Sequence, residues 1–334
     1  MAPLSKRALL AAILQGARGL RWKILYLTED HPFDVVCLRD EERYTCRIYV
    51  WNVTHGGGPR SPSEYRIQIT GVTPPLLAPG GAVTLILGWH EEAGVVVAFD
   101  PELHSDPGHS PSIQIPISTI EQAAEVGIAV HRRGNEELAL AFRPEYFPMY
   151  LRDQDALHKM GDSEEELALL EKAIAQGEVP DELPPSSPLH RRRRASVLLA
   201  RYQRASGFRR RVLAAYGSAC AMCSIQLGLV EAAHIVPVSA PLGTDATSNG
   251  LALCVLHHAC YDQGLIGVEP DYGIILNEDR IDRFATLGLN DGIDTLRKGL
   301  HDEITVPASP QDRPHPDYLL EGLRLRGWDY VSLT

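Results

Sequence analysis

Four potential metal ligands fall into two short pairs in the second half of the chain. The first pair has the spacing C-x2-C, and the second, thirty residues later, has the spacing C-x2-H; the members are Cys220, Cys223, Cys254 and His257. Two such pairs of thiolate and imidazole ligands are typical of a tetrahedral zinc site without an open position. The spacing therefore predicts a structural Zn²⁺ ion, and its binding would supply much of the folding energy of so small a motif.

Three polar residues are interleaved with these pairs: His234 in AAHIVP, Asn249 in SNGLALC, and His258 directly after the last zinc ligand. A single cysteine is usually only a small buried hydrophobe, so one pair alone would mean little. The whole order, however, ends in N-x4-C-x2-H-H and resembles the zinc-bearing HNH (ββα-metal) endonuclease family over residues 208–270. The resemblance implies a β-hairpin that runs into a helix.

The resemblance also implies a role for each polar residue. His234 would be the general base toward water, since imidazole titrates near neutrality. Asn249 would orient this base or its loop, and His258 would bind a hard divalent cation, Mg²⁺ or Mn²⁺, at the scissile phosphate. Asp262 lies four residues after His258 and shares its helix face. This position suits a second metal ligand and a solvent-facing residue equally well.

The sequence departs from the common family pattern at one position. Many members carry Asp or His as a metal ligand directly before the catalytic histidine, and here that residue is Ala233. Glu231 is a nearby carboxylate, but three steps along a strand place it on the opposite face from His234. The sequence therefore leaves open which ligand replaces the one missing at Ala233. For Cys260 we expect interior packing.

A run of arginines precedes the motif. The formal net charge of −11 argues mildly against nucleic acid as a partner, but phosphate binding depends on local cation density. Nine arginines and no acidic residue lie between positions 191 and 211. A solvated helix face is the usual explanation of such a run, but its position ahead of the motif favours DNA. The predicted DNA-binding residues are Arg191, Arg192, Arg193, Arg194, Arg201, Arg204, Arg209, Arg210 and Arg211.

The chain of 334 residues is long enough for two domains with separate cores, and the predicted fold class is α+β. Residues 1–160 open with an amphipathic helix over 2–20. Short segments rich in Val, Ile, Tyr and Thr follow, with a helical pattern over 119–130. This first domain is therefore predicted to be a mixed, mostly antiparallel β domain that recognises the target.

The rest of the chain divides into a connection and a second domain. Residues 161–190 contain an acidic helix over 162–177 and a Pro-rich stretch that suits a linker. The HNH domain, with its basic lead-in helix, is assigned to 191–334.

No motif in the first domain has a chemistry that follows from its residues. Polar and aromatic side chains gather around the glycine run THGGGP, where a backbone can approach a ligand closely. A second polar loop, HSDPGHSPSIQI, could share that surface, although a long turn beside core aromatics explains the same residues. The candidate target-reading residues are Trp51, Asn52, His55, Arg60 and Arg66.

These features predict a restriction-type endonuclease that hydrolyses double-stranded DNA, with modified bases among the candidate targets. Two alternatives stay open: a zinc-stabilised DNA-binding protein without catalysis, and an HNH effector nuclease whose first domain senses a small molecule or a protein. No apolar run could span a membrane, and Gln15 and Arg18 interrupt the segment that suggests a signal peptide. Six cysteines in so long a chain are not a disulfide scaffold. We expect a cytoplasmic protein and leave homodimerisation open.

Overall fold

The computed structural model describes residues 3–55, 61–106, 108, 112–176, 184–185, 190–289 and 291–328. The chain divides into two compact units, Met1–Gln203 and Arg204–Thr334. The division falls inside helix α5 (Arg191–Ala215), whereas the sequence suggested the Pro-rich stretch. Most of that stretch lies outside the described residues.

Unit 1 is built on a seven-stranded sheet with the strand order β1-β2-β3-β6-β7-β10-β9. Neighbouring strands are antiparallel except for β3 and β6, which are parallel. The prediction of a mixed, mostly antiparallel domain is thus confirmed. The strands are β1 (Lys23–Tyr26), β2 (Phe33–Arg39), β3 (Glu42–Asn52), β6 (Val83–His90), β7 (Val95–Phe99), β9 (Ile128–Arg132) and β10 (Leu138–Phe142).

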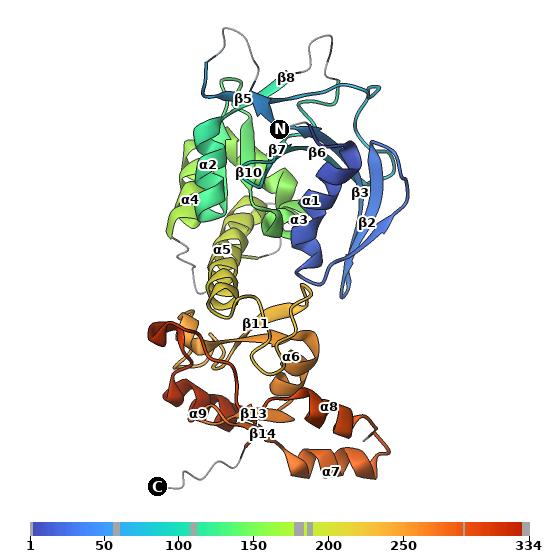
Figure 1. Cartoon of the computed structure of the whole chain (residues 1–334). Coiled ribbons are helices and arrows are strands. Elements are labelled where there is room, and N and C mark those ends of the chain that lie inside the picture. Colours follow the sequence, from blue (N-terminus) through green and yellow to red (C-terminus); the bar gives the residue numbers. More distant parts are fainter. Residues whose placement is uncertain are drawn as a thin grey trace. The chain divides into compact units, whose positions relative to one another are not determined.

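Alternate residues of these strands face opposite sides of the sheet, so unit 1 has two apolar cores. In β6, Leu85 and Leu87 lie in one core and Ile86 lies in the other. Helices cover the first core, and a helix with a small sheet covers the second (Figure 1). The helices over the first core are α1 (Lys6–Arg18), α3 (Phe147–His158), α4 (Glu164–Gln176) and the start of α5. Over the second core lie α2 (Ile117–Val126) and a small sheet of β4 (Thr54–His55), β5 (Glu64–Gln68) and β8 (Ser112–Pro116).

Three elements of unit 1 differ from the sequence prediction. The helix expected over 119–130 ends at Val126, because Gly127 adopts a φ of 111° and the chain turns into β9. Helix α3 was not predicted at all. Helix α4, expected to lie in the connection, buries Leu170 completely in the first core of unit 1.

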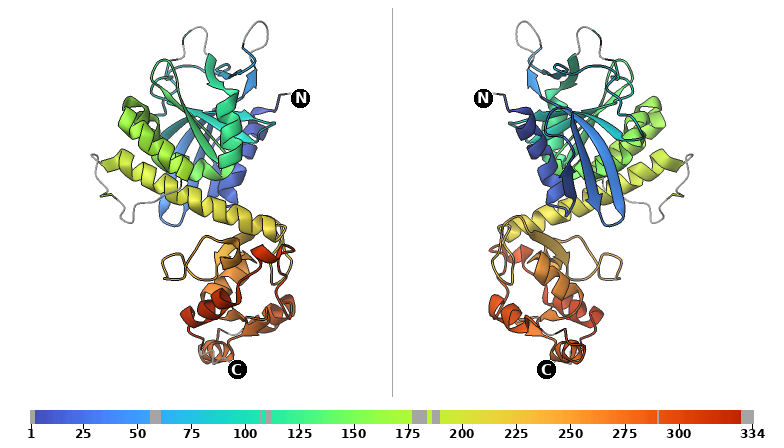
Figure 2. Two further views of the ribbon diagram at one scale, coloured as in Figure 1. Left: turned by 90° about the vertical axis from the view of Figure 1, so that its left-hand side faces the viewer. Right: turned by 90° about the vertical axis from the view of Figure 1, so that its right-hand side faces the viewer.

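Unit 2 begins with the second part of α5, which is one uninterrupted helix (Figure 2). Phe208 and Val212 of α5 belong to the core of unit 2. The helix stops because Gly217 takes a φ of 57°, a left-handed conformation that costs glycine little. The chain then reverses into the segment that carries the first cysteine pair.

The centre of unit 2 is a β-hairpin followed by a helix. Strand β11 (Val230–His234) pairs antiparallel with β12 (Gly250–Cys254), which runs directly into α6 (Val255–Asp262). This is the predicted ββα order. Around it lie β13 (Ile266–Val268), β14 (Ile274–Leu276), α7 (Glu278–Thr286), α8 (Ile293–Gly299) and α9 (Pro316–Leu325). Within the described residues, no helix is both long enough and apolar enough to cross a membrane.

Candidate active site

The four predicted zinc ligands meet at the N-terminal end of α6. The sulfurs of Cys220 and Cys254 lie 3.4 and 3.5 Å from Nδ1 of His257, and those of Cys223 and Cys254 are 3.9 Å apart. All four ligating atoms lie within 4.8 Å of one another. Sulfur ligands at about 2.3 Å from a tetrahedral Zn²⁺ would be about 3.8 Å apart. The group therefore has the dimensions of a zinc site.

The chemistry of the donors also fits a cation. Burial opposes ionisation of the Cys220 thiol, but hydrogen bonds with His257 and with the Cys254 and Met222 backbone outweigh it, and its pKa falls to about 6. Burial raises the pKa of Cys223 and of Cys254, and the neighbouring Cys220 sulfur adds to the effect. Three thiolates in one buried group repel one another. A central Zn²⁺ would hold all three ionised.

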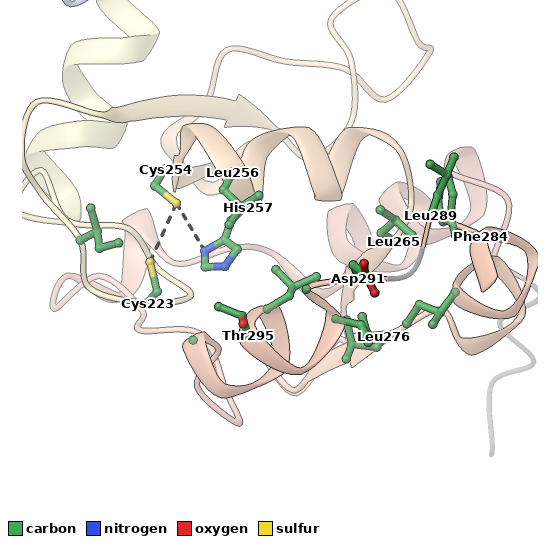
Figure 3. A pocket seen from close by; sticks show the side chains of 16 residues that line it. Cys223, Cys254, Leu256, His257, Leu265, Leu276, Phe284, Leu289, Asp291 and Thr295 are labelled. Carbon is green, nitrogen blue, oxygen red and sulfur yellow. Dashed lines mark hydrogen bonds between the residues drawn. The ribbon is translucent and has the colours of Figure 1, made fainter. Parts of the chain in front are cut away.

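An apolar cavity of about 620 Å³ adjoins this group. Figure 3 shows Cys223, Cys254 and His257 converging at one side of it. Apolar side chains line most of the remainder, among them Leu256, Leu265, Leu276, Phe284 and Leu289. Such surroundings limit the access of water to the metal, which suits a closed structural site.

The predicted base, His234, is fixed at the end of β11. Its ring stacks on Phe208 of α5, with ring centres 3.7 Å apart and planes 8° from parallel. Its Nε2 lies 3.0 Å from Oδ1 of Asp245. Gly250, its partner across the hairpin, makes room for α5, because a Cβ there would lie 2.9 Å from Phe208. The side chain of His234 is nevertheless 26% exposed, so water can reach it.

Asn249 is completely buried and fastens the loop that follows His234. Its Nδ2 donates to the carbonyls of Val236 and Thr244, and its Oδ1 accepts from the Val236 amide. None of these hydrogen bonds is made to His234. Of the two roles that the resemblance implied, this geometry suits orientation of the loop.

His258 lies on the face of α6 that meets Glu231. Nδ1 of His258 is 2.9 Å from Oε2 of Glu231, and its Nε2 is 3.4 Å from Oδ2 of Asp262. Glu231 therefore points toward α6, whereas His234 points toward α5. Ala233 is buried in the core of unit 2. Glu231 is thus the carboxylate that approaches His258 from β11.

Two residues of this site were missed by the sequence analysis. Asp245 approaches His234 from the loop before β12. Arg326 lies just beyond α9, donates to the backbone carbonyls of His234 and Ile235, and has a nitrogen 3.6 Å from Oδ1 of Asp262. Neither residue lies in a motif, so spacing alone could not have found them.

The predicted DNA-binding arginines are divided between the two units. In unit 1, Arg191 pairs with Asp155, and Arg192 pairs with Asp162 and Glu166. Arg193 is exposed, and Arg194 donates to the Pro184 carbonyl. Arg201 also lies in unit 1 and is partly buried.

In unit 2, Arg204 pairs with Asp245, and Arg211 donates to the Asp245 carbonyl. Arg209 donates to the Val230 carbonyl, and Arg210 is exposed. Arg204, Arg209 and Arg211 are therefore attached to the hairpin and loop that hold His234.

The described candidate target-reading residues lie at different places: Trp51 in the second core, Asn52 at the end of β3, and His55 and Arg66 in the small sheet. Trp51 is buried against Tyr49. The side chain of Asn52 exchanges two hydrogen bonds with the backbone of Leu4. Both therefore have structural contacts.

The strands next to the two polar loops lie in one small sheet, because β5 pairs with β4 and with β8. His55 lies 3.0 Å from the Ser61 carbonyl, and Arg66 reaches the Ser112 hydroxyl of the second loop. Arg60 lies outside the described residues.

Two segments of the chain match families of known proteins. Residues 220–269 match the family described as HNH endonuclease, and residues 44–151 match the family described as Methylase-associated X1. Unit 2 therefore contains an HNH endonuclease domain, as the resemblance predicted, and the chain carries a nuclease domain. No curated protein matches the chain.

A solved structure, titled "Modification dependent TagI restriction endonuclease", is 12% identical to this chain. The match covers 87% of this chain and 84% of that one, with a TM-score of 0.29. A superposition this loose carries no conclusion about the fold or the activity of this chain.

Proposed function

We propose that the HNH domain makes this chain a restriction-type endonuclease that hydrolyses double-stranded DNA with the help of a divalent metal ion. One observation carries the proposal: a single ββα motif holds both a fixed but accessible histidine, His234, and the neighbouring side chains of His258 and Asp262. A histidine base and a site for a hard cation are two requirements of phosphodiester hydrolysis. A non-catalytic DNA-binding protein would need neither.

In this proposal His234 takes a proton from water as the water oxygen forms a bond to phosphorus. The P–O3′ bond breaks, and its electron pair leaves on the 3′ oxygen, which takes a proton from solvent. Phe208 fixes the plane of the imidazole, and the loop fastened by Asn249 carries the groups that approach it. The products are a 5′-phosphate and a 3′-hydroxyl.

His258 and Asp262 are the proposed ligands of the catalytic Mg²⁺ or Mn²⁺. Their Nε2 and Oδ2 atoms lie 3.4 Å apart, a separation that two ligands of one ion can adopt. Two protein ligands leave positions for water and for substrate phosphate, as Mg²⁺ usually requires. When bound, the ion would stabilise the negative charge on the phosphate and on the leaving oxygen.

Glu231 is assigned a supporting role at this metal pair. Because it lies at Nδ1 of His258, it would accept the Nδ1 proton and leave Nε2 free to bind metal. Histidines that bind metals commonly donate their other ring N–H to a carboxylate in this way. Glu231 would thereby make up in part for the ligand missing at Ala233.

The arginines of α5 are the proposed contacts to DNA phosphates. We expect the main contribution from Arg209, Arg210 and Arg211, because Arg209 and Arg211 donate to backbone carbonyls of the nuclease domain and Arg210 is exposed. Arg191, Arg192 and Arg204 already pair with acidic side chains, and so they would contribute less. Contacts of this type set affinity and not sequence preference.

Unit 1 is proposed to choose the DNA target. The match of residues 44–151 to a family named for its association with methylases favours DNA whose methylation state matters. The small sheet β4-β5-β8, with His55 and Arg66, is the proposed contact region. Sensing of a small molecule or a protein by unit 1 is the alternative.

The test of this substrate assignment is a digest of matched DNAs. One plasmid is prepared unmodified and in cytosine- and adenine-methylated forms, and each form is incubated with the full chain and Mg²⁺ or Mn²⁺. We expect cleavage rates to differ at least about 10-fold between the forms, the effect of one contact worth roughly 1.4 kcal/mol. Equal cleavage of all forms would assign unit 1 a role other than reading modification.

A further inference from the structure

We infer that Asp245 is a positioning residue that sets which nitrogen of His234 acts as the base. This inference rests on the proposed function, in which His234 takes the proton of the attacking water. Asp245 belongs to the segment PLGTDATSNG, which no motif assigns to the site. Its carboxylate nevertheless lies 3.0 Å from the histidine ring.

The hydrogen bond fixes the position of the imidazole proton. An ionised carboxylate can only accept, so the bond to Oδ1 of Asp245 requires the hydrogen on Nε2 of His234. The lone pair is then on Nδ1. Among the described residues, no group hydrogen-bonds to Nδ1. The geometry therefore leaves Nδ1 available to receive a proton from water.

Asp245 is itself held in place on two sides. Its second oxygen, Oδ2, lies 3.0 Å from Nε of Arg204, and its backbone carbonyl accepts from Arg211 at 2.7 Å. Its side chain is only 16% exposed, which keeps the carboxylate from turning toward solvent. Both arginines come from α5, the helix that also supplies Phe208 beneath the imidazole. Helix α5 thus positions both His234 and Asp245.

Charged side chains lie near His234 on several elements, and each has a defined partner. Asp245 lies at Nε2, and Arg204 and Arg211 contact Asp245 rather than the ring. Arg326 contacts only the backbone carbonyl of His234. Glu231 is turned toward His258. Among the described residues, Asp245 is therefore the charged group that hydrogen-bonds to the imidazole.

This arrangement has a consequence for the tautomer of His234. The side-chain amide of an asparagine at position 245 could donate as well as accept, so it would no longer require the hydrogen to be on Nε2. In part of the molecules the hydrogen would then be on Nδ1, where it would prevent that nitrogen from taking a proton from water. Loss of the carboxylate should therefore reduce the cleavage rate, and another carboxylate at the same position should restore part of it.

The experiment is a comparison of Asp245→Asn with the parent protein under single-turnover conditions. Asn is nearly isosteric but uncharged. We expect the cleavage rate to fall about 10- to 10²-fold, a part of the 10²- to 10⁴-fold that a positioned base contributes, with unchanged DNA affinity. Asp245→Glu keeps a carboxylate that can only accept and should cut faster than Asp245→Asn. Asp282→Asn, an exposed position of α7, is the matched control and should behave as the parent.

The outcomes separate this inference from the proposed function. If the parent protein cuts DNA, His234→Ala does not, and Asp245→Asn cuts at the parent rate, the positioning role is wrong and the nuclease proposal survives. An equal loss of rate in Asp245→Asn and Asp245→Glu would also overturn the inference, because it indicates only a loosened loop. If the parent protein does not cut DNA, the failure lies in the proposed function. Zinc content, measured for every variant, shows that unit 2 is folded.

Discussion

Replacement of His234 by alanine is expected to abolish cleavage while zinc content and DNA affinity stay at the parent level. The imidazole ends β11 and contacts Phe208 and Asp245, but it is not part of the zinc group. Its loss removes the base and leaves the fold. The single-turnover rate should fall on the order of 10²- to 10⁴-fold, the usual contribution of general acid–base catalysis.

The matched control is His301→Ala, which removes an exposed histidine of the same unit and should cut DNA as fast as the parent. A filter-binding assay without divalent metal gives the DNA affinity of both variants. If His234→Ala cuts as well as the parent protein, the proposed mechanism fails.

The second large effect is expected from Cys254→Ser, which should lose zinc and unfold unit 2. Cys254 joins the end of β12 to the start of α6, so a metal bound there would link the hairpin to the helix through it. Binding of structural Zn²⁺ contributes roughly 10–16 kcal/mol in zinc-finger peptides, more than the stability of a typical domain. Hydrogen exchange should show loss of protection in peptides from residues 204–328, and protection in unit 1 should persist.

Cys260 provides a matched control for this experiment. It is buried in the same core but lies outside the ligand group, so Cys260→Ala should retain zinc and cost on the order of 1 kcal/mol. A Cys254→Ser protein with parent stability and no zinc by elemental analysis would refute the structural site.

Alanine variants of the adjacent residues His257 and His258 should differ in zinc content and in the metal concentration that cleavage requires. His257→Ala removes a zinc ligand and should resemble Cys254→Ser. His258→Ala should keep its zinc and need a higher concentration of Mg²⁺ or Mn²⁺ for cleavage, because His258 contacts Glu231 and Asp262 and not the cysteines. An exchange of these two phenotypes would show that the pair was assigned in the wrong order.

Local patterns in the sequence predicted the centre of unit 2 well. The four predicted zinc ligands and the shared face of His258 and Asp262 follow from spacing and periodicity, and the structure brings these residues together. The ββα order follows from the family resemblance and is also present. The opposite orientation of Glu231 and His234 follows from the period of a strand. Each of these features depends on residues that are near neighbours in the chain or in the hairpin.

Contacts between distant segments could not be predicted in this way. Arg326 reaches the backbone of His234 from 92 positions away. Asp245 is one acidic residue in a polar loop, and its approach to His234 depends on the path that Asn249 imposes on that loop. Sequence periodicity does not predict the conformation of this loop, because side-chain hydrogen bonds determine it.

Unit 1 shows the same limit at the level of whole elements. The strands were recognisable, but the parallel pairing of β3 with β6 requires a crossover that no local pattern specifies. Helix α3 combines Pro148 with aromatic residues, which resemble a loop in isolation. Proline is nevertheless favoured in the first turn of a helix, and burial of Phe147 and Tyr150 stabilises α3.

The most direct test of the central claim is a metal titration of single-turnover DNA cleavage by the parent protein. The protein is freed of loosely bound ions, its zinc is measured, and Mg²⁺ or Mn²⁺ is then added stepwise. We expect about one zinc per chain throughout, no cleavage before the addition, and a rate that rises to saturation with the added ion. Cleavage at the full rate before any addition, or no cleavage of any DNA at saturating Mg²⁺ and Mn²⁺, would contradict the account.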